Sequence, residues 1–233
     1  MLADAPTALS QIDFFYPAGP LYPHHMQPPQ IYLASASPRR SALLTQIGLE
    51  HRVQAVNIDE SLMAGEAPID YVCRLARSKA QVLWDRLSCR GETQPKFPLV
   101  LGADTAVVFD GQIYGKPADR EEGLRMLQRL SGRTHRVHTA VALCCQDWLE
   151  HRCSISEVSF RELTLQECAA YWDTGEPFDK AGGYAVQGRA AAFISYIAGS
   201  YSGVMGLPLY ETSQLLLRAG YTVSSMDNKE RQS

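Results

Sequence analysis

Apolar runs with strand character alternate with helices between residues 31 and 220, and this alternation limits the possible folds more than any other feature. Ser37, Asp119 and Thr164 each stand where a side chain can cap the first turn of a helix. Asp110-Gly111 is a strong signal for a hairpin turn. The runs with strand character cover residues 31–34, 51–56, 98–108, 134–145, 154–160 and 192–197. Helices alternating with these runs, with hairpins in the middle, predict an α/β fold with a mixed sheet.

The two ends of the chain differ in composition from the region between them. Six of the thirteen prolines fall within residues 1–30, which show no sustained periodicity. Residues 224–233 are polar. We therefore predict a proline-rich N-terminal arm (1–30), one folded domain (31–223) and a polar C-terminal tail (224–233).

Charge and hydropathy exclude several classes of protein. The 22 lysines and arginines against 25 aspartates and glutamates give a net charge of −3, whereas a protein that coats nucleic acid is normally basic. No apolar run approaches the roughly 18–20 residues that cross a bilayer. The first Lys or Arg is Arg39, so the cationic start of a secretory signal is absent. We expect a cytoplasmic protein that binds neither nucleic acid nor membranes.

The six cysteines are too few for a disulfide scaffold and have no C-x-x-C spacing. Cys144 and Cys145 are adjacent and should lie on opposite faces of a strand. No histidine or basic pair frames any of the cysteines along the sequence. We predict reduced, mostly buried thiols without special reactivity.

A loop of small residues leads from the first strand into a helix. The segment Ser35–Ser37 precedes Pro38, and the free N–H groups and positive dipole end of that helix could bind a phosphate. Arg39 and Arg40 stand in the first turn, where the dipole disfavours cations unless an anion offsets it. The alternative is an ordinary serine cap with two solvated arginines.

A carboxylate interrupts the most apolar strand. Asp104 stands within the run 98–108, and such a group is expensive to bury unless it is paired, metal-bound or hydrogen-bonded. Gly102 and Ala103 leave space beside it. Asp104 is therefore a candidate general base or metal ligand, although an aspartate that only caps a loop remains an alternative.

Two lysines and one acidic pair are weaker candidates. Lys79 falls within the apolar stripe of the second predicted helix, where it either serves a site or extends its amine to solvent. Lys116 lies in a rigid turn after the hairpin. Asp59 and Glu60 follow a strand and offer oxygen ligands for Mg²⁺, or form an ordinary turn.

A glycine-rich segment, residues 178–188, predicts tight turns and close backbone approach. Tyr184 could stack on a ring there, and Gln187 could read the edge of a base through its paired donor and acceptor. A flexible loop without a ligand is the alternative. His135 and His138 differ by three positions, so on a strand they point to opposite faces and are poor candidates for joint metal binding.

Taken in order, these segments resemble the Maf family of nucleoside triphosphate pyrophosphatases. The matching segments are LASASPRRSALL (33–44), NIDES (57–61), ARSKA (76–80), LGADT (101–105), GKP (115–117), LSGRTHRVHTAVAL (130–143), DKAGGYAVQG (179–188) and GLPLYET (206–212). The glycine-rich segment is similar to that of the branch that acts on dTTP and UTP. The resemblance extends over about residues 31–220.

The resemblance implies an elongated α/β fold like that of inosine triphosphate pyrophosphatases, with two lobes around a central cleft. It implies hydrolysis of dTTP and UTP to the monophosphate and pyrophosphate, with modified pyrimidine nucleotides as further candidate substrates. The residue roles carried over are Asp104 as proton acceptor; Arg39, Thr105 and Gln187 as specificity positions; and Ser35, Arg40, Glu60, Lys79 and Lys116 in the phosphate and metal site, with Glu60 and Asp104 as metal ligands.

The same resemblance implies a divalent cation, Mg²⁺ or Mn²⁺, and a homodimer. The residues agree in kind with this function, because a triphosphate needs several cations and four basic side chains from separate segments could supply them. The alternative from another class is a nucleotide-sensing binding protein that regulates cell division, with hydrolysis incidental.

Overall fold

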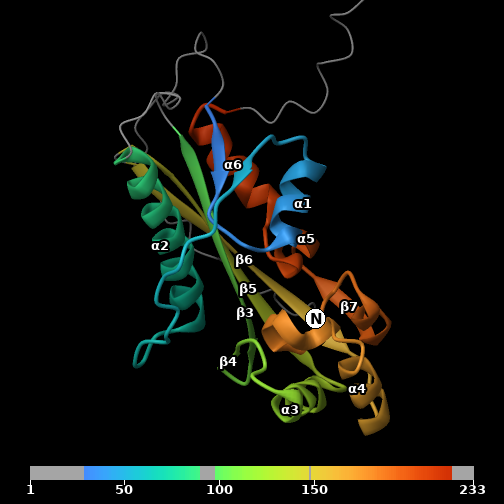
Figure 1. Cartoon of the computed structure of the whole chain (residues 1–233). Coiled ribbons are helices and arrows are strands. Elements are labelled where there is room, and N and C mark those ends of the chain that lie inside the picture. The colour runs from blue at the N-terminus through green and yellow to red at the C-terminus, as the bar shows by residue number, and fades with distance from the viewer. Residues whose placement is uncertain (1–28, 90–97, 147, 222–233) are drawn as a thin grey trace, which may run out of the picture.

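The computed structural model describes residues 29–89, 98–146 and 148–221, which form a seven-stranded mixed sheet flanked by helices (Figure 1). The strands are β1 (Ile31–Leu33), β2 (Arg52–Val53), β3 (Leu99–Phe109), β4 (Gln112–Tyr114), β5 (Thr134–Cys145), β6 (Trp148–Phe160) and β7 (Ile194–Ala198). The helices are α1 (Pro38–Gln46), α2 (Pro68–Ser88), α3 (Arg120–Leu130), α4 (Leu165–Trp172), α5 (Tyr201–Met205) and α6 (Leu209–Arg218), with short 3₁₀ helices η1 (Glu176–Asp179), η2 (Ala181–Gly183) and η3 (Arg189–Phe193). The predicted α/β class with a mixed sheet is confirmed.

The strand order is β2-β1-β3-β5-β6-β7, with β4 also paired to β3. Strand β1 runs parallel to both β2 and β3, whereas the remaining pairs are antiparallel. Strands β3, β5 and β6 are the long ones and extend through the whole height of the molecule (Figure 1).

One edge of β3 is divided between two short strands. One full edge of β3 pairs with β5, from Val100 to Val108. On its other edge, β1 pairs with Leu99–Leu101 and β4 pairs with Val107–Phe109. Among the described residues, the stretch between these two pairings has no strand partner on that side. The gap lies at the middle of the sheet, beside the loop from β1 to α1 and the loop that follows β4.

The core has three parts because side chains alternate along β3. Leu99 and Leu101 pack with α1 and α6 on one face of the sheet, and Val107 packs on the same face with α3 and α4. Val100 and Ala106 face the other way, toward α2. The helices α1, α2 and α6 thus build an upper lobe, and α3, α4 and β4 build a lower lobe, as the resemblance implies (Figure 1).

Two of the three predicted side-chain caps are present, at the starts of α3 and α4. The Asp119 carboxylate accepts a bond from the Glu122 amide at 2.8 Å, and Thr164 and Glu167 form a reciprocal capping box. Ser37 is the N-cap residue of α1, but the predicted side-chain cap is wrong. The Ser37 amide instead donates to Ser35 Oγ, so the preceding loop is folded back on itself.

Several boundaries differ from the prediction. Strand β2 has only two residues because it pairs with Tyr32 and Leu33 alone, at the short end of β1. Strand β6 begins at Trp148 rather than Ser154, because its first half pairs with β5 although its outer face is polar. The sequence reading did not predict α5 or the 3₁₀ helices, which are too short to show a periodicity.

The predicted arm and tail cannot be compared with this structure. The tail (224–233) and residues 1–28 of the arm lie outside the described residues, so the division into arm, domain and tail stays a prediction. None of the helices in the described part of the chain combines the length and apolar composition that a membrane span requires.

Candidate active site

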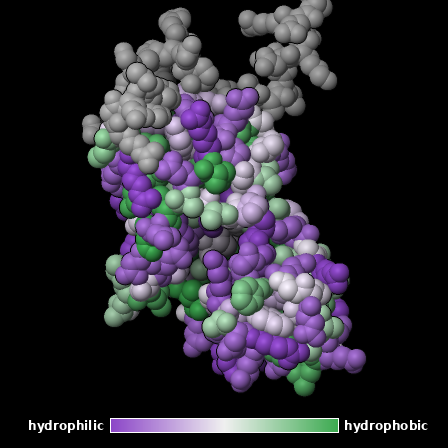
Figure 2. Space-filling view, viewed as in Figure 1, coloured by the Kyte–Doolittle hydropathy of each residue, from purple (hydrophilic) through white to green (hydrophobic). Residues whose placement is uncertain are grey.

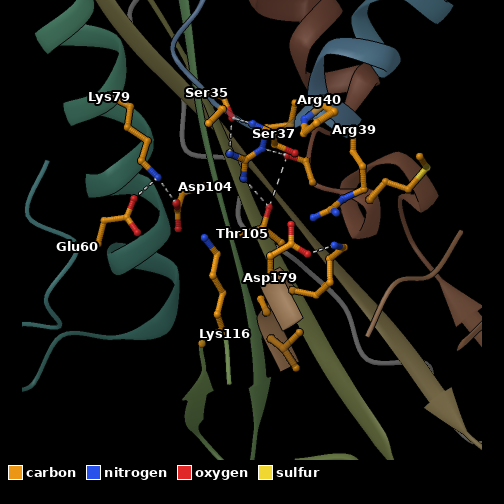
Figure 3. Close-up of a pocket in the computed structure, with 18 of the residues that line it drawn as sticks. Ser35, Ser37, Arg39, Arg40, Glu60, Lys79, Asp104, Thr105, Lys116 and Asp179 are labelled. Atoms are coloured by element: carbon orange, nitrogen blue, oxygen red, sulfur yellow. Dashed lines mark hydrogen bonds and ion pairs between the residues drawn. The ribbon is translucent and has the colours of Figure 1, made fainter. Parts of the chain in front are cut away.

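A cavity of about 750 Å³ opens at the gap along the edge of β3. Figure 2 shows the corresponding hollow between the two lobes. All nine predicted site residues line it: Ser35, Arg39, Arg40, Glu60, Lys79, Asp104, Thr105, Lys116 and Gln187. Residues from six separate segments therefore meet in one place, most of them visible in Figure 3.

Asp104, Lys79 and Glu60 form a charge cluster on the α2 side of the cavity. The Lys79 ammonium lies 2.7 Å from Asp104 Oδ1 and 2.7 Å from Glu60 Oε1. Lys79 and Asp104 are each only 8% exposed. Burial would raise the pKa of Glu60, but the hydrogen bond and charge of Lys79 outweigh it and hold that pKa below its ordinary value. The alternative in which Lys79 extends to solvent is thus wrong.

Gly102 allows α2 to come close enough for this cluster to form. A Cβ atom at position 102 would stand 2.3 Å from the Ala76 carbonyl oxygen and 2.6 Å from the Ala80 amide nitrogen. The space that the sequence suggested beside Asp104 is therefore filled by the backbone of α2. Lys79 lies between those two helix residues, so the close packing at Gly102 places its side chain beside Asp104.

Arg40 is the centre of a second cluster on the opposite face of β3. Its guanidinium donates to the Gly206 carbonyl at 2.7 Å, to Ser35 Oγ at 3.1 Å and to Thr105 Oγ1 at 3.2 Å. Thr105 also accepts a bond from Thr139 Oγ1 at 3.2 Å. Burial lowers the pKa of Arg40, and the nearby charge of Asp104 opposes this. Arg40 is thus a fixed cation whose geometry is set by β1, β3 and α5.

Asp104 and Thr105 are neighbours that point to opposite faces of β3, yet both reach the cavity. This is possible because β3 has no strand partner at that height on one edge, so the cavity is open to both faces. Each face contributes a different group: a carboxylate with Lys79 on one, and a hydroxyl with Arg40 on the other.

Two further cations have acidic neighbours only at longer range, Arg39 near Asp179 and Lys116 near Glu60. Among the described residues, Arg39 and Lys116 make no hydrogen bond or ion pair, and Figure 3 shows both side chains directed into the cavity. The start of α1 lines the same space, and Ser37 does not cap this helix with its side chain. Cations beside an uncapped helix N-terminus are suited to an anion, so the phosphate site expected from the loop of small residues stays a prediction.

The glycine-rich segment closes the lower side of the cavity. Gly182 has φ 69° and donates its N–H to the Gly115 carbonyl at 2.9 Å, and a Cβ there would meet Val107 Cγ2 at 2.8 Å. This contact brings Asp179 and Gln187 to the cavity wall. Our sequence reading did not single out Asp179, which pairs with its neighbour Lys180.

Comparison with known proteins identifies the family to which this chain belongs. Residues 30–219 match the family model described as Maf-like protein. The chain belongs to the Maf-like family. It is 54% identical over 202 residues to a protein of Bordetella parapertussis named dTTP/UTP pyrophosphatase, an alignment that covers 84% of this chain and 95% of the relative. Proteins of the same name from Alkalilimnicola ehrlichii (52%, covering 82% and 95%) and Colwellia psychrerythraea (49%, covering 84% and 91%) are similar.

Beside the cavity, the lower core of this Maf-like chain holds a ring cluster built on a buried histidine. His135 Nε2 lies 2.8 Å from the Tyr184 hydroxyl, and the Tyr184 ring packs edge-on against Phe160 at 4.9 Å. Tyr184 lines the cavity, but these contacts fix its ring. His138 packs on the other face of β5, so the expected separation of the two histidines is confirmed.

Burial makes this cluster sensitive to acid. Burial lowers the pKa of His135 to about 4, against about 6.5 in the unfolded chain. The unfolded state therefore binds the extra proton first, and the stabilisation present above pH 6.5 is lost as the pH falls toward 4, by up to about 3 kcal/mol. We expect His135→Gln to flatten the fall in urea-unfolding free energy between pH 6.5 and 4. Parallel curves for the two proteins would exclude this role.

The prediction that no cysteine is framed by a histidine is wrong for one site. Cys73 of α2 lies beside Cys153 and His151 of β6, far from it in sequence. The spacing His151-x-Cys153 was the available signal, because alternate residues of a strand share a face. By contrast, Cys144 and Cys145 pack on opposite faces of β5, as predicted.

Proposed function

We propose that this protein is a nucleoside triphosphate pyrophosphatase that hydrolyses dTTP and UTP to the monophosphate and pyrophosphate. The observation that carries the proposal is that four cations far apart in sequence converge with two carboxylates on one cavity: Arg39, Arg40, Lys79 and Lys116 with Glu60 and Asp104. The names of the relatives, which match over nearly their whole length, support the same reaction and the same nucleotides.

The cations divide into two groups by their contacts. Arg40 and Lys79 are held by protein partners and supply fixed positive charge. The side chains of Arg39 and Lys116 make no hydrogen bond or ion pair among the described residues and can close on the phosphates. A triphosphate carries about four negative charges near neutral pH, so these side chains and the α1 amides balance it although the whole chain has a net charge of −3.

Asp104 is the proposed proton acceptor. Lys79 holds its Oδ1, which leaves Oδ2 for a water molecule that attacks the α-phosphorus. The bond between the α-phosphorus and its bridging oxygen to the β-phosphate breaks, and pyrophosphate leaves with its charge already paired to the basic side chains. Positioning and charge stabilisation are the main needs of such a transfer, so no covalent nucleophile is required.

The donor set fits a divalent cation, and Mg²⁺ or Mn²⁺ is proposed. Glu60 and Asp104 both approach the Lys79 ammonium, so two carboxylates already converge around one positive charge. Carboxylate and phosphate oxygens are the ligands that such hard cations prefer. When bound, the cation would polarise the attacked phosphate.

A panel of nucleoside triphosphates with separate detection of pyrophosphate and orthophosphate tests the proposal. We expect pyrophosphate from dTTP and UTP in the presence of Mg²⁺, with little from purine nucleotides. Release of orthophosphate instead would contradict the bond assignment. Tight binding without any release would support the nucleotide-sensing alternative, which no feature of the cavity favours.

Gln187 is proposed to select the base. It lines the cavity from the glycine-rich segment and is exposed there, away from the cluster of Lys79 and Asp104. Gln187→Ala should change the ratio of kcat/KM between UTP and other nucleotides by about tenfold, since one lost hydrogen-bonding pair has this value. Lys116→Ala is the matched control, because loss of a phosphate contact should weaken all nucleotides alike. If Gln187→Ala, like Lys116→Ala, lowered kcat/KM by the same factor for every nucleotide, Gln187 would not select the base.

The homodimer and the cytoplasmic location are further proposals, carried by the family resemblance and the composition. Size-exclusion chromatography with light scattering measures the first, and imaging of a tagged protein in cells measures the second.

A further inference from the structure

A cluster of three side chains with affinity for electrophiles lies outside the cavity, between α2 and the edge of the sheet. Cys73 Sγ is 2.8 Å from Cys153 Sγ, and a nitrogen of His151 lies within 4.8 Å of both sulfur atoms. The two cysteines are half-buried and the histidine is exposed. The cluster is therefore open to small molecules from solvent.

The position of the cluster follows from the sheet. Cys153 and His151 are two residues apart on β6 and share the face that packs against α2. Strand β7 pairs with β6 only from Glu157 to Phe160, so this part of β6 has no strand partner on its outer side among the described residues. The two cysteines thus lie where α2 contacts this unpaired part of the β6 edge.

Electrostatics makes the two thiols unequal. The hydrogen bond with Cys153, helped by one with His151, lowers the pKa of Cys73 well below its ordinary value, while burial and the charge of Asp70 oppose the shift. The same hydrogen bond raises the pKa of Cys153. These shifts favour Cys73 as the thiolate and nucleophile of the pair, with Cys153 as the thiol that keeps its proton.

We propose that Cys73 and Cys153 are a hydroperoxide-reactive pair that closes into a disulfide between α2 and β6. The sulfur atoms need to approach by less than 1 Å to reach the bonded distance of about 2.05 Å. A zinc ion held tetrahedrally at about 2.3 Å would instead need them about 3.7 Å apart, and the described residues offer it only three ligands. The geometry therefore favours the disulfide over a metal site.

The reaction balances with one hydroperoxide. The Cys73 thiolate attacks one peroxide oxygen, the O–O bond breaks, and the departing hydroxide takes up the proton that Cys73 had given up; Cys73 becomes a sulfenic acid. Cys153 sulfur then attacks Cys73 sulfur, the S–O bond breaks, and hydroxide leaves as water with the Cys153 proton. Two thiols are oxidised by two electrons and hydrogen peroxide is reduced to two waters.

The experiment uses the full chain, reduced and then treated with an equimolar amount of hydrogen peroxide. Free thiols should fall from six to four. Trypsin should release residues 53–74 linked to 153–161, and each of these peptides contains a single cysteine. A reducing thiol should restore all six. In Cys153→Ser, the link should be absent and a sulfenic-acid probe such as dimedone should label Cys73.

Cys89→Ser is the matched control, because Cys89 is an exposed cysteine at the end of the same helix with no sulfur partner among the described residues. It should form the 73–153 link as the unaltered chain does. Oxidation of Cys89 while Cys73 stays reduced would overturn the proposal. So would purified protein that retains one zinc ion per chain and loses it in Cys153→Ser, since this would assign a metal site. These readouts do not depend on the pyrophosphatase reaction.

Discussion

Asp104→Asn should lower kcat for dTTP by at least about 100-fold, with a smaller change in KM. The amide retains the size of the side chain and an oxygen for Lys79, but it cannot accept a proton from the attacking water. Steady-state kinetics with pyrophosphate detection, at saturating Mg²⁺, measures the effect.

The control for this variant is Asp110→Asn at the hairpin turn after β3. Asp110 has φ 50°, which asparagine tolerates, and its carboxylate is not among the groups that line the cavity. It should retain kcat within about twofold, as expected for a surface change. Near-normal turnover of Asp104→Asn would show that another group takes the proton, and Asp179 would be the next carboxylate to examine.

Gly102→Ala should damage both stability and activity, although it adds a single methyl group at a distance from any substrate. The new Cβ would overlap the backbone of α2 at Ala76, so the helix must retreat by about 1 Å. We expect a loss of about 1–3 kcal/mol in unfolding free energy. The retreat also carries Lys79 away from Asp104, and a displacement of this size costs about 100-fold in kcat.

Gly115→Ala provides the matched control for stability. A Cβ at position 115 would have no atom within 4 Å, and the residue does not have a positive φ. Its melting temperature should equal that of the unaltered protein. If Gly102→Ala were equally stable and active, the close packing of α2 on β3 would not be what positions Lys79.

Local signals in the sequence predicted local structure well. Asp119 and Thr164 begin their helices as predicted because a cap needs only residues three positions apart. Ser37 shows the limit of such rules. It occupies the cap position but makes no side-chain cap, and its own amide donates to the Ser35 hydroxyl, which also accepts from Arg40.

The site needed information that no local pattern contains. The sequence named Lys79 and Asp104 separately, but their contact depends on how closely α2 approaches β3, which Gly102 decides. The family resemblance supplied the set of residues and the cavity contains all of them, while their roles remain proposals. The pairing of Cys73 with Cys153 depends on the path of β6 across α2, and so it could not be read from spacing.

The unbroken strands β3, β5 and β6 have a mechanical consequence. The register between β3 and β5 continues without interruption from Val100 to Val108, past the level of the cavity. Bending one lobe away from the other would break this ladder, so the two walls cannot swing apart as hinged domains do. Entry of substrate and release of product must therefore depend on movement of the bordering loops, at residues 35–37, 55–60, 115–116 and 179–187. Stiffening those loops is thus the way to slow product departure without touching the chemistry.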